Sequence, residues 1–150
     1  MKTLVLLFSF LISYNYSTAQ IFFSENFEIV AAPLLPTNWT VQTLSNDGGY
    51  TTGDSADANP NGSWVVSGHT QFAMSNDDVC NCDKLHDYLI LPAQNFSTIV
   101  GGIDLEAQVH HDGVFGGSAN LMVSVDSGDT WQLVQTFAFS ANWQNVVVSL

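Results

Sequence analysis

Basic residues are nearly absent from this chain. Its 150 residues include no arginine and two lysines, against 14 aspartates and glutamates, so the formal net charge is −12. Lys2 lies in the N-terminal leader, and without it the charge is −13 (−12 minus the +1 of Lys2), with Lys84 as the remaining cation. Such an acidic surface repels phosphate backbones and anionic lipids, which argues against nucleic acid as a partner. It suits an extracellular protein that binds cations.

Long apolar runs are also missing after the first 19 residues, so no later segment predicts membrane insertion. Those 19 residues combine a charged start, an apolar core and the small residues Ser17 and Ala19 just before Gln20. This pattern predicts a secretory signal peptide over residues 1–19 and a secreted or cell-surface location. The other 131 residues (150 − 19) suffice for one domain with its own core, over residues 20–150.

Sustained helical periodicity is absent too. Residues 102–110 alternate apolar and polar side chains, which predicts a half-buried antiparallel strand. Residues 21–28 predict another strand, and residues 45–63, rich in Asn, Asp, Gly and Ser, predict a long surface loop. Many short strands with turn signals between them predict an all-β fold, an antiparallel β-sandwich or jelly roll. The sequence ends within an apolar strand over residues 144–150, so we expect the sandwich to lack its closing C-terminal strands.

Cysteine is scarce: Cys80 and Cys82 are the only two, and one residue separates them. In an exported chain a disulfide is the first expectation. An extended Cys-x-Cys places the two Cα atoms about 7 Å apart, the outer limit for a bridge, so a disulfide here requires a tight bend. Zinc held by Cys80, Cys82 and His86 is the alternative, although this spacing is not a standard pair of ligand pairs.

Carboxylates gather around these cysteines within residues 72–92, where Asn76, Asp77 and Asp78 form a polar run after a short apolar segment. Adjacent like charges repel, so such a cluster is stable when a cation or hydrogen bonds offset it. Oxygen-rich loops are where proteins hold calcium. We therefore predict a structural calcium ion, with a solvated acidic loop as the alternative. The spacing is not that of an EF-hand.

Residues 124–131 match the Asp-box hairpin pattern S-x-D-x-G-x-T-W at every fixed position. In this pattern the aspartate side chain caps the turn, the glycine adopts positive φ, and the tryptophan packs back on the hairpin. We interpret the box as a folding device and not as a catalytic site. Its residues are Ser124, Asp126, Gly128, Thr130 and Trp131.

Catalytic motifs are missing as well. The sequence has no G-x-S-x-G nucleophile turn and no H-E-x-x-H zinc motif. His110, His111 and Asp112 invite a general-base interpretation, but they precede a Gly-rich stretch at a strand end, where solvent-facing polar residues are the simpler explanation. We therefore predict a binding module and not an enzyme. A glycoside-acting enzyme is an alternative, and it requires two carboxylates about 5–10 Å apart in a cleft.

Several short motifs follow one another in a fixed order along the chain: Phe27-Glu28, Leu35-Pro36-x-x-Trp39, Ser75-Asn76-Asp77-Asp78, Asp87-Tyr88-Leu89-Ile90-Leu91-Pro92, the Asp-box hairpin and Trp143 before an apolar strand. In this order they resemble the cleaved-adhesin or choice-of-anchor J domains of secreted Bacteroidetes proteins, which are relatives of the MAM-like jelly rolls. The resemblance covers about residues 22–150.

The resemblance implies a calcium-bearing jelly-roll module for adhesion, exported by the type IX route, with Glu28, Asn76, Asp77 and Asp78 as the metal ligands. The family's closing Asp-Asp strand and its C-terminal sorting domain have no counterpart here. We expect a secreted or cell-surface module that binds an extracellular glycan or protein, within a larger multidomain protein. The alternative is a non-catalytic accessory domain of a larger secreted peptidase.

Overall fold

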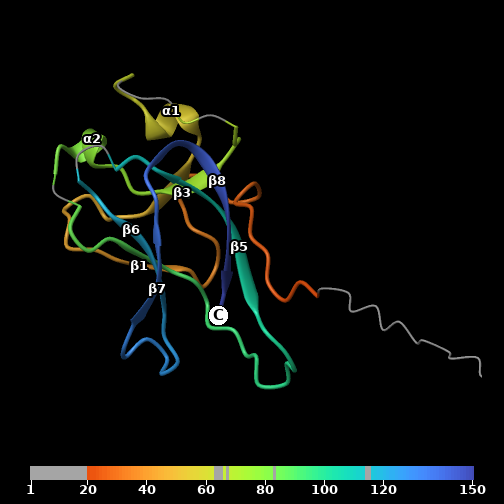
Figure 1. Cartoon of the computed structure of the whole chain (residues 1–150). Helices are drawn as coiled ribbons and strands as arrows, with labels where there is room; N and C mark the ends of the chain where they lie inside the picture. The colour runs from red at the N-terminus through yellow and green to blue at the C-terminus, as the bar shows by residue number, and fades with distance from the viewer. Residues whose placement is uncertain (1–19, 63–65, 67, 83, 114–115) are drawn as a thin grey trace, which may run out of the picture.

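The computed structural model describes residues 20–62, 66, 68–82, 84–113 and 116–150, with the side chains of residues 78 and 79 outside the description. Short strands dominate this part of the chain (Figure 1), which confirms the all-β prediction. The elements are β1 (Thr40–Gln42), β2 (Thr51–Gly53), α1 (Ser55–Ala58), β3 (Phe72–Met74), α2 (Asp77–Cys80), β4 (Tyr88–Ile90), β5 (Asp104–His111), β6 (Ala119–Val123), β7 (Gln132–Phe137) and β8 (Ser140–Ser149). No described helix is long and apolar enough to cross a membrane.

The strands pair as antiparallel couples: β1 with β4, β2 with β3, β5 with β8, and β6 with β7. Within the described residues, each of these couples is a separate two-stranded sheet. The three couples other than β6–β7 join segments that are distant in sequence, as antiparallel folds with crossovers do. The antiparallel pairing agrees with the prediction, whereas the sandwich or jelly-roll arrangement stays a prediction.

The longest pairing joins β5 to β8, with Leu105 opposite Val148 and Ala107 opposite Val146. Exposed and half-buried residues alternate along most of β5, so the predicted half-buried strand is confirmed, shifted to Asp104–His111. The register shifts between Val109 and His111, and beyond that point the alternation stops. A bulge of this kind turns successive side chains toward the same side of a strand.

The best-buried apolar cluster contains Ala58 of α1, Val66 and Phe72 of β3, with Met74 and Trp143 packed against it. The Phe72 and Trp143 rings meet edge to face with centroids 5.3 Å apart. This contact joins β3 to β8, and α1, which supplies Ala58, lies next to β3 (Figure 1).

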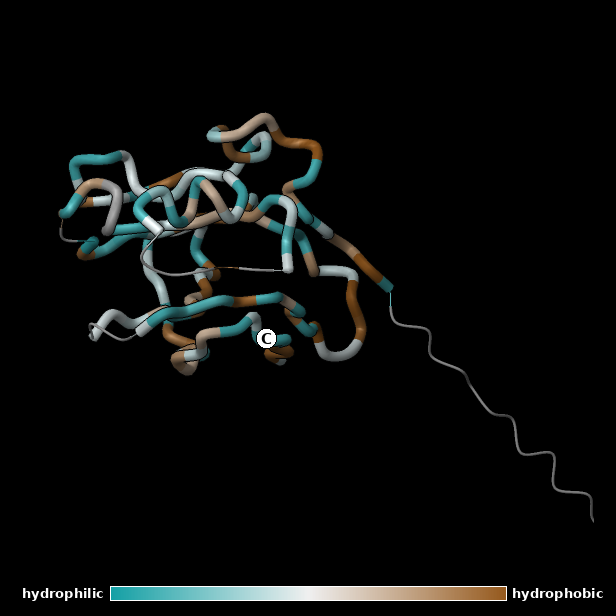
Figure 2. Tube along the Cα trace, turned by 90° about the horizontal axis from the view of Figure 1, so that it is seen from above, coloured by the Kyte–Doolittle hydropathy of each residue, from teal (hydrophilic) through white to brown (hydrophobic). Residues whose placement is uncertain are grey.

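The predicted strand over residues 21–28 is wrong, because the structure has irregular backbone there. Glu25 accepts a hydrogen bond from the Phe27 amide at 2.6 Å, and Asn26 accepts one from the Glu28 amide at 3.2 Å. Phe27 itself has a φ of 64°. Such local side-chain bonds compete with a strand ladder. Figure 2 shows the apolar start of this segment at the periphery of the molecule, and Ile21 is 80% exposed.

The predicted loop over residues 45–63 also needs correction, because it contains β2 and α1. Asp54 caps α1 by accepting hydrogen bonds from the amides of Ala56 and Asp57, at 2.7 and 3.1 Å. Asp57 returns the contact by accepting from the Asp54 amide at 3.0 Å. This capping box satisfies backbone donors that a short helix leaves open. A Cβ on Gly53 would lie 2.6 Å from Met74 Cε, so glycine allows this close packing.

Candidate functional site

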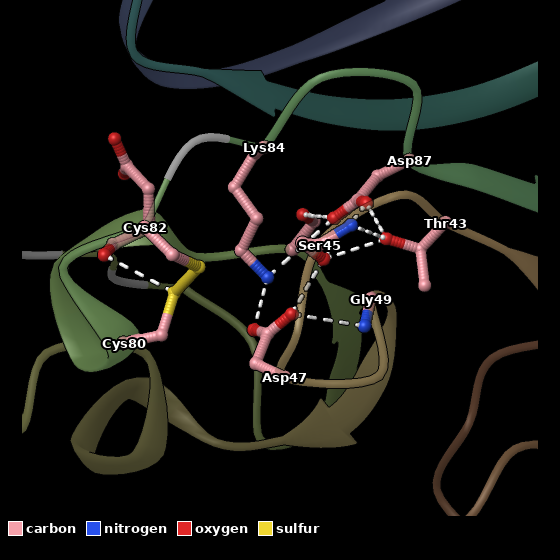
Figure 3. Close-up of a disulfide and its surroundings, with 10 residues drawn as sticks. Thr43, Ser45, Asp47, Gly49, Cys80, Cys82, Lys84 and Asp87 are labelled. Atoms are coloured by element: carbon pink, nitrogen blue, oxygen red, sulfur yellow. Dashed lines mark hydrogen bonds and ion pairs between the residues drawn. A yellow bond between two sulfur atoms is a disulfide. The ribbon is translucent and has the colours of Figure 1, made fainter.

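A polar cluster lies where residues 43–49 face residues 84–87, and Lys84 is at its centre. The Lys84 ammonium group contacts Asp47 Oδ2 and lies 3.5 Å from Asp87 Oδ2 (Figure 3). The Lys84 and Asp87 side chains are mostly buried, with exposed fractions of 14% and 5%, whereas Asp47 lies at the surface with 25% of its side chain exposed. Lys84 therefore occupies a position between two carboxylates, where a metal ion could otherwise balance their charge.

Asp87 is the anchor of this cluster. It accepts hydrogen bonds from the hydroxyls of Ser75, at 2.6 Å, and Ser45, at 3.2 Å, and from the Thr43 hydroxyl. Burial raises the pKa of Asp87, but the bonds from Ser75 and Thr43 and the charge of Lys84 outweigh this effect and lower the pKa. Asp87 is consequently a fixed, ionised group that ties β1 and β3 to the start of β4.

Asp47, the second carboxylate that contacts Lys84, is also held by several hydrogen bonds. Its Oδ1 is the nearer of the two carboxylate acceptors of the single Ser45 hydroxyl proton, at 2.6 Å, and it also accepts from the Gly49 amide at 3.1 Å. The hydrogen bond from Lys84 and then that from Ser45 lower the pKa of Asp47 to about 2. The loop between β1 and β2 is thus ordered by its own aspartate.

Cys80 and Cys82 form a disulfide beside this cluster, with their Cα atoms 5.1 Å apart. The tight bend that the sequence requires is present, since Asn81 between them has a φ of 46°. Asparagine adopts this left-handed backbone at a lower cost than most residues. Among the described residues, the two sulfurs and an Asp47 oxygen form the one group of three potential ligand atoms within 4.8 Å of one another. Because both sulfurs are bonded to each other, the zinc alternative through Cys80, Cys82 and His86 has no thiolate in this state.

A pocket of about 440 Å³ opens next to Asp47, and residues from four separate segments line it. Its volume is in the range of small-ligand sites. The hydrogen bonds described above hold Asp47 and Asp57, and the Asn76 side-chain amide donates to the Ala58 carbonyl. Both polar and apolar residues therefore line the pocket. The lining residues are Ala32, Pro33, Asp47, Gly49, Thr51, Thr52, Asp57, Met74 and Asn76.

The residues predicted to hold calcium come from two segments of the chain. Asn76 and Asp77 stand together at the start of α2, and Asp77 is exposed. Glu28 accepts a hydrogen bond from the Thr70 hydroxyl. The Asp78 side chain lies outside the described residues, so the distances within the full set are not defined and the calcium site stays a prediction.

The Asp box has the local geometry that its sequence suggests. Asp126 accepts hydrogen bonds from the Thr130 hydroxyl and, at 2.9 Å, from the Thr130 amide, and these bonds lower its pKa to about 2. Ser124 donates to Asp126 at 2.7 Å. Gly128 has a φ of 95°, and Trp131 lies against it, 3.7 Å from where a Cβ would be. The box sits in the connection between β6 and β7.

Sequence reasoning missed Thr43, Ser45, Asp47 and Lys84 as parts of one site. A single cation among many carboxylates is a signal for such a site, but its partner is 37 residues away. No family model, curated protein or solved structure matches the chain. The likeness to choice-of-anchor J domains therefore remains a resemblance of motifs.

Proposed function

We propose that the chain is a secreted or cell-surface binding module, without catalytic activity, that takes a neutral glycan into the pocket beside Asp47. The observation that carries this proposal is the set of fixed acceptors in that pocket. Asp47 and Asp57 each accept backbone hydrogen bonds that hold them in place. Acceptors fixed before binding lose little entropy when a ligand arrives.

The chemistry of the lining favours sugar over other ligands. The carboxylates of Asp47 and Asp57 can accept hydrogen bonds from sugar hydroxyl groups, and the side-chain amide of Asn76 offers both a donor and an acceptor. Pro33 and Met74 add apolar surface for the C–H face of a sugar ring. The pocket volume of about 440 Å³ suits one or two sugar rings and is too small for a protein face. The net charge of −12 disfavours sulfated or sialylated glycans.

Calcium remains part of this proposal as a structural ion. Asn76 belongs to both the glycan pocket and the predicted calcium site, because it lines the pocket and is one of the predicted ligands with Glu28, Asp77 and Asp78. An ion at the start of α2 would stabilise the edge of the pocket. No binding step is assigned to it.

A rim substitution tests the pocket. Ala32 lines it and is exposed, so Ala32→Trp adds bulk at the opening without disturbing the core. Ala93 is also exposed and does not line the pocket, which makes Ala93→Trp the matched control. We expect a neutral oligosaccharide found on a glycan array to bind wild type and Ala93→Trp equally by calorimetry, and Ala32→Trp at least about tenfold more weakly. Equal binding by all three proteins would show that the glycan binds outside this pocket. An array on which no glycan binds would contradict the proposal that the ligand is a glycan.

A further inference from the structure

The Cys80–Cys82 disulfide contributes little to holding the fold together. A disulfide stabilises a protein mainly by closing a loop in the unfolded chain, and this effect grows with the number of residues enclosed. Here the bridge spans a sequence separation of 2. The chain has no other cysteine, so this bridge cannot be one member of a stapling framework. Because a disulfide that closes so short a loop adds little stability, its surroundings are the guide to another role.

The bridge lies at a half-buried position beside the Lys84 cluster. Both cysteines are half-buried and so are accessible to an external thiol. Lys84 extends beside the bridge toward Asp47, and an Asp47 oxygen lies within 4.8 Å of both sulfurs (Figure 3). The Asp47 carboxylate by itself disfavours a thiolate here, and the Lys84 ammonium group that contacts it offsets part of its charge.

The bridge can also open without unfolding its neighbours. Cys80 is the last residue of α2, and Asn81 forms the bend by itself. The ion pairs of Lys84 and the hydrogen bonds of Asp87 hold the adjoining segments independently of the sulfurs. We therefore expect reduction to remove one local constraint and to leave the polar cluster in place.

We propose that this disulfide is a thiol–disulfide exchange site that oxidises an external dithiol. A thiolate of the dithiol attacks one bridge sulfur, a new S–S bond forms, and the Cys80–Cys82 bond breaks with its electron pair on the leaving sulfur. The second thiol of the partner then loses its proton and attacks the partner's own sulfur in the mixed disulfide, which releases the remaining cysteine of this chain as a thiolate. The partner leaves as a disulfide, while Cys80 and Cys82 gain the two electrons and two protons that the partner has lost.

The acidic surface narrows the class of dithiol. With a net charge of −12, the chain repels anionic thiols such as glutathione and accepts neutral or basic ones. A dithiol peptide or protein of neutral or positive charge is the partner that fits.

The test uses dithiothreitol, a neutral dithiol, and the full-length chain. Samples are quenched with an alkylating agent, and the number of modified cysteines is read by mass spectrometry, while near-UV circular dichroism reports the tryptophan environment. We expect reduction in native buffer within about tenfold of its rate in denaturant, with the near-UV signal retained and the bridge restored by oxidised dithiothreitol. Reduction slower than this, or a near-UV signal lost in step with reduction, would overturn the proposal.

A second measurement separates exchange from stapling. The Cys80→Ser/Cys82→Ser variant has no bridge, and if the bridge staples little, its thermal midpoint should lie within about five degrees of wild type. Loss of cooperative unfolding in this variant would show a structural disulfide and reject the exchange role. Neither result depends on the glycan pocket, which is assayed by binding.

Discussion

The Lys84 ammonium group joins the carboxylates of Asp47 and Asp87, contacting the first and lying 3.5 Å from the second. This bridge connects the segment after β1 to the segment before β4, across 37 residues of sequence. Lys84 is the only basic residue of the chain apart from Lys2. The whole cluster therefore depends on one cation.

Replacing that cation should be costly. Lys84→Met leaves the buried carboxylate of Asp87 without its cation and next to the surface carboxylate of Asp47, and we expect the free energy of unfolding to fall by about 2–3 kcal/mol at neutral pH. Urea denaturation followed by tryptophan fluorescence measures this loss. Lys84→Arg keeps the charge and should recover more than half of it. A loss below about 0.5 kcal/mol in Lys84→Met would show that the bridge is solvated.

The same cluster predicts a pH dependence. The pKa of Asp47 is lowered to about 2, and that of Asp87 is lowered as well. A carboxylate with a depressed pKa contributes stability that is present above the pKa of the unfolded chain, about 4, and is lost as the pH falls through the folded value. Wild type should lose this contribution between about pH 4 and pH 2. Denaturation curves at both ends should show the gap between wild type and Lys84→Met narrowing in acid; a constant gap would contradict the assignment.

Local features could be predicted from the sequence, and long-range ones could not. The alternation in β5 and the Asp-box turn each depend on residues within about ten positions. The capping box of α1 was a local signal too, at Asp54 and Asp57, but a four-residue helix has no periodicity to draw attention to it. Lys84 meets Asp47 only because the strands β1 and β4 pair, and no pattern within either segment predicts that pairing.

The Asp box offers a test of turn chemistry. Gly128 has a φ of 95°, whereas Gly117 does not have a positive φ. A Cβ added at Gly128 would lie 3.7 Å from its nearest neighbour, and one at Gly117 would have no neighbour within 4 Å, so neither substitution causes a steric clash. Gly128→Ala should cost about 1–2 kcal/mol of unfolding free energy from backbone strain alone. Gly117→Ala should change it by less than about 0.5 kcal/mol. Chemical denaturation measures both, and equal effects would mean that the turn does not impose its backbone.

Calcium should stabilise the chain if the predicted ligands act together. We expect added calcium to raise the thermal midpoint of wild type by several degrees over the chelated protein, with saturation. Asp77→Asn/Asp78→Asn should abolish this shift. Glu106→Gln removes an exposed carboxylate of β5 and should keep it. A cooperative transition that ignores calcium would reject the metal and leave a solvated acidic loop.

Asp87 should matter more than Asp47, although both contact Lys84. The Asp87 side chain is 5% exposed and accepts from three hydroxyls, whereas that of Asp47 is 25% exposed. Asp87→Asn leaves buried donors without an anionic acceptor and should cost about 2–3 kcal/mol. Asp47→Asn should cost only about 1 kcal/mol, because solvent screens its interaction with Lys84. Urea denaturation of both variants at neutral pH compares them, and the reverse order would place the energetic centre of the cluster in the loop after β1 instead of at the start of β4.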